Sequence, residues 1–364
     1  MSKTAKTAPG HYSIRIKKLR EEMAGRKLDA YLIQDRMDQY WLTGFTGEDG
    51  SVLLTPRAVV LLTDGRFDEA AAREAPFARK VLRKKRKPEE TVKELKRAKA
   101  KRVGFNRDHM TVGDYDALRK LAGPIKLVPT ESLVTPHRAR KDADEVEKLR
   151  AAIRVAEQAF QSVRAWLRPG QTEREIAAQL AYEMQKLGAQ GETFPAIVAV
   201  GANSSLPHYE PGDVKLAENQ LLLIDWGARV DWYGSDLTRV VWLGTLSAQM
   251  RAVFDVVRAA HDRALEAVRP GIKAKAVDKV AREIIHKAGY GKQFNHGLGH
   301  GLGIVAHESP RVAKTSADVL QPGMVITIEP GVYLPGVGGV RLEDDVLVTE
   351  TGYEVLSSLP VEFS

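Results

Sequence analysis

The chain has 364 residues, 43% of them hydrophobic, which is typical of a globular protein long enough for two domains. It contains no cysteine, so disulfides and thiolate metal sites are excluded, and a reducing compartment is favoured. No apolar run approaches the length of a membrane span, and residues 1–10 lack the apolar core of a secretory signal. We therefore expect a cytoplasmic protein that does not enter membranes.

The net charge of +8 is distributed unevenly. Residues 1–140 hold 31 Lys and Arg against 18 Asp and Glu, whereas residues 141–364 hold 24 against 29. The basic excess peaks at residues 79–102, and a nucleic-acid patch is one interpretation of that run. Acidic residues interrupt the run and no aromatic residue lies within it, so a solvated surface of loop and helix is favoured, with no nucleic-acid partner.

Residues 1–138 show the mixed helix and strand patterns of an α/β domain. They contain no nucleophile elbow, phosphate loop or ligand cluster, which indicates a supporting role. The expected helices are 14–23, 68–74, 89–100 and 112–121; the expected strands are 29–33, 52–54, 59–62, 103–105 and 126–129, with a turn at 44–50.

The second domain, residues 139–364, begins with a long amphipathic helix. Apolar residues recur at spacings of three and four from Asp142 to Leu167, and Pro169-Gly170 ends the pattern. Thr172 and Glu175 then have the spacing of a capping box for a second helix, which ends near Gly188.

Two carboxylates occupy the next segment. The apolar run 221–224 predicts a buried strand with Asp225 at its end, and the returning strand carries Asp236. Asp at a strand end is usually a turn former. However, carboxylates beside apolar strands are costly to bury without a positive partner, and no lysine lies beside these two. A divalent cation is therefore favoured.

The same arrangement recurs about one hundred residues later. Glu329 ends the apolar run 325–328, Glu343 lies on the returning arm, and His300 lies between the two hairpins. The turn 167–170 is also echoed at 268–271, with a long helix before each copy and a shorter one after it. The second domain is thus expected to contain two related α/β units. Their four carboxylates and one imidazole suit two divalent ions that share bridging ligands.

At these residues the chain resembles the metallopeptidase family of aminopeptidase P, prolidase and methionine aminopeptidase, whose catalytic domain has the pita-bread fold. The resemblance is dense over residues 140–364 and weaker in the first domain, where segments 40–47 and 63–67 look like the N-terminal domain of bacterial Xaa-Pro aminopeptidases. Methionine aminopeptidases lack that domain. The resemblance therefore implies an α/β (α+β) protein with a creatinase/prolidase-type domain, a pseudo-twofold catalytic domain and proline specificity.

The resemblance also implies roles for individual residues. Asp225 would chelate one ion, Asp236 and Glu343 would bridge two, and His300 and Glu329 would complete the second, with Glu329 also moving a proton. The family precedent favours Mn²⁺, with Co²⁺ or Zn²⁺ as alternatives. Residues implied to hold the substrate or stabilise its carbonyl oxygen are His208 and His307. His296 is assigned a supporting or substrate-contacting role, and Arg341 either pairs with a ligand carboxylate or meets the substrate.

The expected activity is hydrolysis of the peptide bond before a proline at the second position. The amide before proline has no N–H, so a peptidase cleft that depends on that donor would bind it poorly. The sequence favours an aminopeptidase for longer peptides over a dipeptidase (prolidase). Alternatives are a catalytically inactive binding module and a metal-free creatinase-like hydrolase, but neither keeps the full ligand set. The family also implies a homodimer, with Trp41 and the 44–50 loop as candidate contacts.

Overall fold

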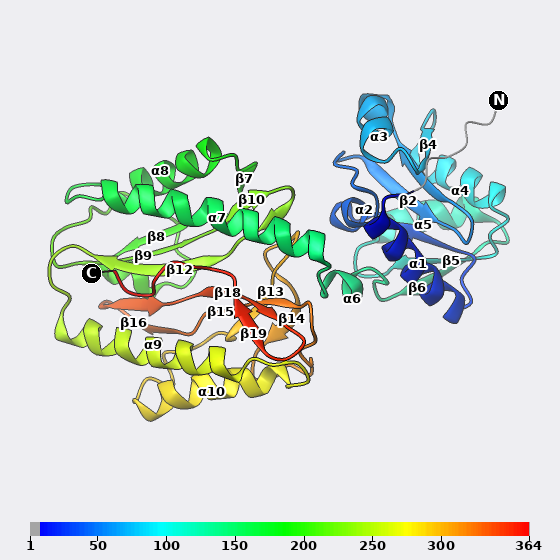
Figure 1. Cartoon of the computed structure of the whole chain (residues 1–364). Helices are drawn as coiled ribbons and strands as arrows, with labels where there is room; N and C mark the ends of the chain where they lie inside the picture. The colour runs from blue at the N-terminus through cyan, green and yellow to red at the C-terminus, as the bar shows by residue number, and fades with distance from the viewer. Residues whose placement is uncertain (1–7, 364) are drawn as a thin grey trace. The chain divides into compact units, whose positions relative to one another are not determined.

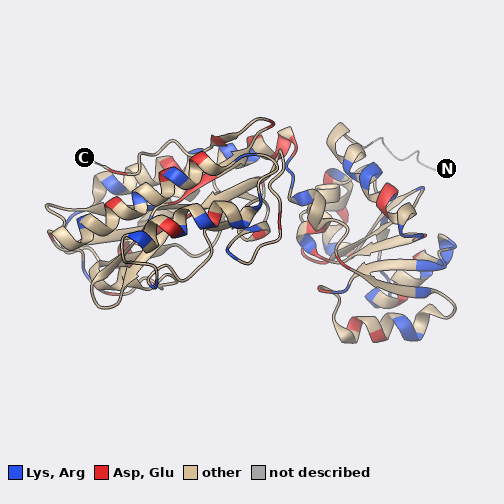
Figure 2. Ribbon diagram, turned by 90° about the horizontal axis from the view of Figure 1, so that it is seen from below, with Lys and Arg blue, Asp and Glu red and all other residues tan. Residues whose placement is uncertain are grey.

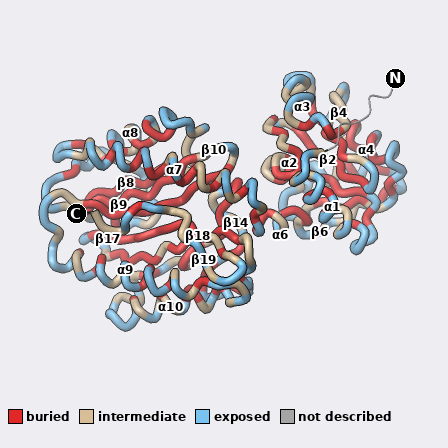
Figure 3. Tube along the Cα trace, viewed as in Figure 1, coloured by how far each residue is buried: buried red, intermediate tan, exposed pale blue. Residues whose placement is uncertain are grey.

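The computed structural model describes residues 8–363 and divides into two compact units, with the boundary between Arg138 and Ala139. Each unit has its own hydrophobic core, and Figure 3 shows buried strands in both, with exposed positions along the helices. Among the described residues, no helix combines the length and hydropathy needed to cross a membrane.

The N-terminal unit is built on one mixed sheet with the strand order β4-β3-β2-β1-β5-β6 (Figure 1). Strand β2 pairs antiparallel with both β1 and β3. The other pairs are parallel: β5 pairs with β1 and with β6, and β4 pairs with β3. The strands are β1 (Ala30–Ile33), β2 (Gly50–Leu54), β3 (Val59–Thr63), β4 (Arg79–Leu82), β5 (Arg102–Asn106) and β6 (Lys126–Thr130). The helices are α1 (Gly10–Gly25), α2 (Arg36–Thr43), α3 (Asp68–Glu74), α4 (Lys87–Arg97), α5 (Val112–Ala122) and α6 (Thr135–Arg138), with a 3-10 turn at Gly65–Phe67.

Helix α2 is absent from the sequence prediction, which placed only a turn after it. Asp35 caps its N-terminus by accepting from Asp38 N at 2.8 Å, and Gly44 ends it at a φ of 75°, a conformation that favours glycine. The helix buries Trp41, whose ring stacks on His137 within the same unit. Trp41 is therefore a core residue, which corrects its assignment as a surface contact.

The basic run is also more structured than predicted. Its first residues form β4, an edge strand, rather than a loop, since Val81 and Leu82 continue the pairing with β3. Several of its charges have acidic partners, including Arg79 with Glu94 and Arg83 with Asp49. Figure 2 shows basic and acidic segments interspersed along the helices of both units.

The C-terminal unit consists of two halves with the same order of elements. In Figure 1 the strands lie between one helix pair, α7 (Ala143–Trp166) and α8 (Glu173–Lys186), and the other, α9 (Ala248–Ala267) and α10 (Ala274–Lys287). Asp142 and Glu145 form a capping box at α7, and the predicted box of Thr172 and Glu175 at α8 is confirmed.

Each half has a three-stranded antiparallel arrangement and a hairpin inserted between its last two strands. In the first half β9 pairs with β8 and β12, and β10 and β11 form the insertion; in the second, β15 pairs with β13 and β18, and β16 and β17 form it. The predicted duplication of helices and carboxylate hairpins is thus present in the topology. The first-half strands are β7 (Gly191–Glu192), β8 (Ile197–Val200), β9 (Leu221–Trp226), β10 (Ala228–Val230), β11 (Tyr233–Gly234) and β12 (Leu237–Trp242). The second-half strands are β13 (Gly299–Gly301), β14 (Glu308–Val312), β15 (Val325–Ile328), β16 (Gly331–Leu334), β17 (Gly338–Arg341), β18 (Asp344–Val348) and β19 (Tyr353–Val355).

Candidate metal centre

Four of the five predicted metal ligands lie at or beside the ends of strands in the two halves, and the fifth lies within a short strand. The first half supplies two of them from the β9–β12 pair, and the second half supplies the other three. Asp225 lies near the end of β9, Asp236 precedes β12, His300 lies in β13, Glu329 follows β15, and Glu343 lies between β17 and β18. This placement follows from the apolar runs, which form the buried strands and leave the ligand residues where the strands end or bend.

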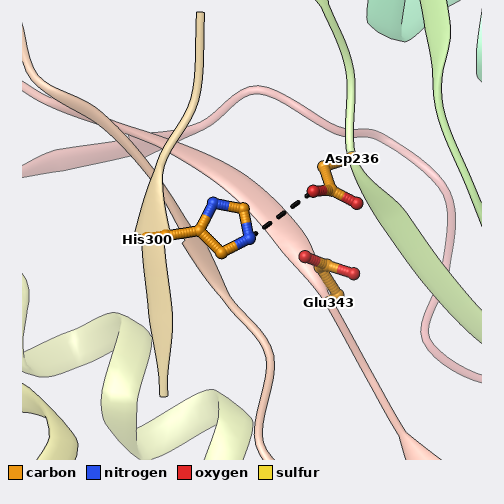
Figure 4. Close-up of side chains that lie close together, drawn as sticks. All are labelled: Asp236, His300 and Glu343. Atoms are coloured by element: carbon orange, nitrogen blue, oxygen red, sulfur yellow. Dashed lines mark ion pairs between the residues drawn. The ribbon is translucent and has the colours of Figure 1, made fainter. Parts of the chain in front are cut away.

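Three of these side chains form one compact cluster (Figure 4). Asp236, His300 and Glu343 each offer a ligand atom, and these atoms lie within 4.8 Å of one another. His300 Nε2 lies 3.6 Å from Asp236 Oδ2 and 3.4 Å from Glu329 Oε1, so Glu329 adjoins the cluster. These four side chains, from the two halves of the C-terminal unit, can therefore offer ligand atoms to one small volume.

Asp225 has a different partner, the guanidinium of Arg341. Arg341 Nη2 donates to Asp225 Oδ2 at 2.5 Å, and Nη1 donates to the hydroxyl of Tyr333 at 2.8 Å. Arg341 thus pairs with a predicted ligand carboxylate and supplies, from 116 positions away, the positive partner that no neighbouring lysine provides. The other carboxylate oxygen, Asp225 Oδ1, is buried without a hydrogen-bond partner among the described residues. An additional cation could satisfy it.

Burial and mutual repulsion favour protons on the carboxylates in the absence of metal. The pKa values of Asp236 and Glu343 are raised well above their ordinary values by burial and then by neighbouring carboxylates. Burial is also the main cause that raises the pKa of Glu329 to about 8, while Arg341 opposes the shift. Burial lowers the pKa of His300 to about 4, which leaves its imidazole neutral and able to ligate a metal.

Three polar side chains that the sequence reasoning missed hold these groups in place. Thr238 Oγ1 donates to Glu343 Oε2 at 2.6 Å and accepts from Arg341 Nε at 3.1 Å. Thr327 Oγ1 accepts from His300 N at 3.1 Å and contacts Glu329 Oε1 at 3.3 Å. Tyr333 joins Arg341 to His296, whose Nε2 lies 2.9 Å from the tyrosine oxygen. All three lie on or beside strands that carry candidate ligands. The alternation of side chains along those strands is the sequence signal that could have indicated their supporting role.

The predicted substrate-binding histidines surround the same centre. The His307 ring lies 4.2 Å from the His300 ring, measured between centroids. His208 is exposed on the loop after β8 and lies within electrostatic range of Asp225, His296 and His307. The residue before His208 is Pro207, and its carbonyl accepts from Arg341 Nη1 at 3.4 Å.

The donor set fits divalent metal ions. Buried carboxylates that repel each other, a neutral imidazole and an unsatisfied Asp225 oxygen are what oxygen-preferring or borderline cations require. A purely structural ion-pair network would need more cations than the single guanidinium of Arg341. The described residues therefore form a candidate metal centre.

Comparisons with known proteins agree with this geometry. The family model described as metallopeptidase family M24 matches residues 147–350, and the model described as the creatinase/prolidase N-terminal domain matches residues 15–140. The five candidate ligands all fall within the first match.

Relatives align over nearly the whole chain. An Xaa-Pro dipeptidase of Pyrococcus horikoshii is 34% identical over 94% of this chain and 96% of its own length. The solved structure of an Xaa-Pro dipeptidase from Bacillus anthracis has a TM-score of 0.93 at 33% identity, covering 96% of this chain and 99% of the other. That of an X-Pro aminopeptidase from Thermotoga maritima has a TM-score of 0.90 at 34% identity, with the same coverage.

Proposed function

The chain belongs to metallopeptidase family M24, and from this premise we propose that it hydrolyses the peptide bond between an N-terminal residue and a following proline. The observation that carries the proposal is the convergence of buried carboxylates and one neutral imidazole from both halves of the duplicated unit. The names of the similar proteins support proline specificity. An inactive binding module would have no need to retain this costly cluster.

We assign two divalent metal ions to the centre, with Mn²⁺ as the first choice. Asp225, Asp236, His300, Glu329 and Glu343 would hold them. When bound, such ions activate water and stabilise negative charge that develops on the substrate carbonyl oxygen. The carboxylates would lose their protons on binding the ions, because the ions replace the missing positive charge.

The remaining groups of the centre would orient the substrate and move protons. Glu329 would take a proton from the attacking water at a carboxylate oxygen and return it to the departing proline nitrogen. That nitrogen leaves as a secondary amine and needs this proton. His208 and His307 would donate to the substrate carbonyl oxygen, and Arg341 would hold Asp225 in its orientation.

Two substrate lengths remain as candidates. The motifs at residues 40–47 and 63–67 favour longer peptides, as an aminopeptidase would use, whereas two of the relatives reported above carry the name Xaa-Pro dipeptidase. A dipeptidase is therefore the second candidate.

The test is a comparison of purified protein on Ala-Pro, on Ala-Pro-Ala-Ala and on Ala-Ala-Ala-Ala. Cleavage of a proline peptide without cleavage of the alanine peptide supports the proposal. A strict preference for Ala-Pro selects the dipeptidase, and a preference for the tetrapeptide selects the aminopeptidase. Equal cleavage of the proline and alanine tetrapeptides would overturn the specificity.

A further inference from the structure

A fully buried carboxylate outside the metal centre organises the loop that carries His208. Glu173 lies in the first turn of α8 and is 0% exposed. Its Oε1 accepts from Val200 N at 2.7 Å and from Asn203 Nδ2 at 2.9 Å. Its Oε2 accepts from the hydroxyl of Tyr209 at 2.8 Å and from Gly212 N at 3.0 Å. One side chain thus joins both ends of the segment 200–212.

The same segment is attached on its other side to β17. Ser204 Oγ accepts from Gly339 N at 2.7 Å, and the Pro207 carbonyl accepts from Arg341. His208 lies between Pro207 and Tyr209, two residues that these contacts hold. Its backbone is therefore fixed from two directions, although its side chain is exposed.

The duplicated half shows that the fold does not require this carboxylate. The two helix starts are built alike, since Gly170 N donates to Leu216 O in the first half and Gly271 N donates to Leu320 O in the second. The position equivalent to Glu173, 101 residues later, is Ala274, which is buried to the same extent. The equivalent helix of the second half therefore begins and packs without a buried carboxylate at this position.

A buried carboxylate is costly unless hydrogen bonds compensate for its lost hydration. All four donors to Glu173 come from the segment that carries His208, and none comes from the core of the helix pair. The free-energy cost of burying Glu173 is therefore offset by hydrogen bonds that depend on the position of this loop.

We propose that Glu173 is a positioning residue that fixes segment 200–212 and, through it, the imidazole of His208 against the substrate. The inference rests on the proposed function, because it takes His208 as the substrate-contacting group. Glu173 itself touches neither the metal ligands nor the substrate.

The test uses the full chain, with Glu173→Gln as the main variant and Glu175→Gln as its control. Glu173→Gln keeps the shape but replaces one acceptor oxygen by a donor, which leaves donors of the loop unpaired. Glu175→Gln, in the same helix turn, neutralises an exposed capping group whose hydrogen bonds are with Thr172 and not with the loop. We expect Glu173→Gln to lower kcat/KM on a proline peptide roughly 10- to 100-fold with unchanged metal stoichiometry. The control should stay within about twofold of the wild type.

A double-mutant cycle with His208→Ala separates positioning from general destabilisation. If Glu173 acts through His208, the double variant is no slower than His208→Ala alone; multiplicative losses would overturn the inference. Should Glu173→Gln fold poorly, Tyr209→Phe removes one donor to Glu173 and leaves Oε2 its hydrogen bond from Gly212 N, and the same cycle applies.

Amide hydrogen exchange provides a readout that does not depend on turnover. Faster exchange across residues 200–212 in Glu173→Gln, with the Glu175→Gln variant unchanged, supports the inference. Unchanged exchange overturns it. Absence of proline-peptide cleavage by the wild type would instead overturn the proposed function, and the exchange result would still decide whether Glu173 holds the loop.

Discussion

Thr238 and Glu343 lie opposite each other where the two halves of the C-terminal unit meet. Thr238 Oγ1 donates to Glu343 Oε2 at 2.6 Å, and Glu343 N donates to Thr238 O at 3.2 Å. These contacts form a β-bridge between the strand pair of the first half and the ligand segment of the second. The carboxylate of Glu343, a candidate metal ligand, is thereby held in register with Asp225, which pairs with Thr238 across β9 and β12.

Replacing Thr238 by valine should weaken metal binding, because the change removes a hydroxyl that orients Glu343 and keeps the side-chain shape. We expect a loss of about 10- to 100-fold in metal affinity and about 1–3 kcal/mol in stability. Titration calorimetry with Mn²⁺ and urea unfolding would measure both. Thr238→Ser, which retains the hydroxyl, is the matched control, and wild-type affinity in the valine variant would contradict this role.

Arg341 should be needed for the stability of the metal-free protein. Its guanidinium is buried and contacts Asp225, Thr238, Tyr333 and the Pro207 carbonyl. Arg341→Met leaves the Asp225 carboxylate buried without a cation, which should cost about 3–5 kcal/mol. Arg341→Lys keeps the charge but lacks the planar fork, so its loss should be smaller. Urea unfolding in the presence of a chelator measures both; a methionine variant as stable as the wild type would show that the ion pair contributes nothing.

The metal-free protein should become less stable as the pH rises toward 8. Burial raises the pKa of Glu329 from its ordinary 4.5 to about 8. Between these values Glu329 holds a proton in the folded state that the unfolded state has lost, so its contribution to the free energy of unfolding falls with increasing pH. The lowered pKa of His300 opposes this only below its ordinary value of 6.5, so the fall is expected between pH 6.5 and about 8. The raised pKa values of Asp236 and Glu343 act in the same direction.

Urea unfolding across this pH window, with and without metal, tests the prediction. Glu329→Gln should reduce the slope, and saturating metal should also reduce it, since the bound ions displace the protons. Calorimetry in buffers of different ionisation enthalpy should show proton release on metal binding below pH 8. A stability that is independent of pH in the metal-free protein would contradict the assignment.

The positions of two candidate ligands at strand ends could be predicted because their signals are local. Asp225 and Glu329 each end an apolar run that becomes a buried strand, and the duplication repeats the pattern at a similar spacing. The helix at 142–167 was predicted almost to its ends, since its apolar spacing and its terminating Pro-Gly are both in the sequence.

The groups that hold the ligands could not be found in the same way. Thr238 and Thr327 are ordinary strand residues in the sequence, and only the register of the strands brings them to Glu343 and His300. The partner of Asp225 is Arg341, 116 positions away, so no local pattern indicates the pair. Helix α2 and strand β4 were missed because both are short and polar, and pairing or packing with distant residues stabilises them.

The central claim is that residues from both halves hold divalent ions that enable cleavage before proline. Its most direct test is the activity of chelator-stripped protein on Ala-Pro and Ala-Pro-Ala-Ala, before and after Mn²⁺, Co²⁺ or Zn²⁺ is restored, with Glu343→Gln measured in parallel. We expect no cleavage by stripped protein, recovery with at least one metal, and no recovery in the variant. Full cleavage by protein shown to be free of metal would contradict it.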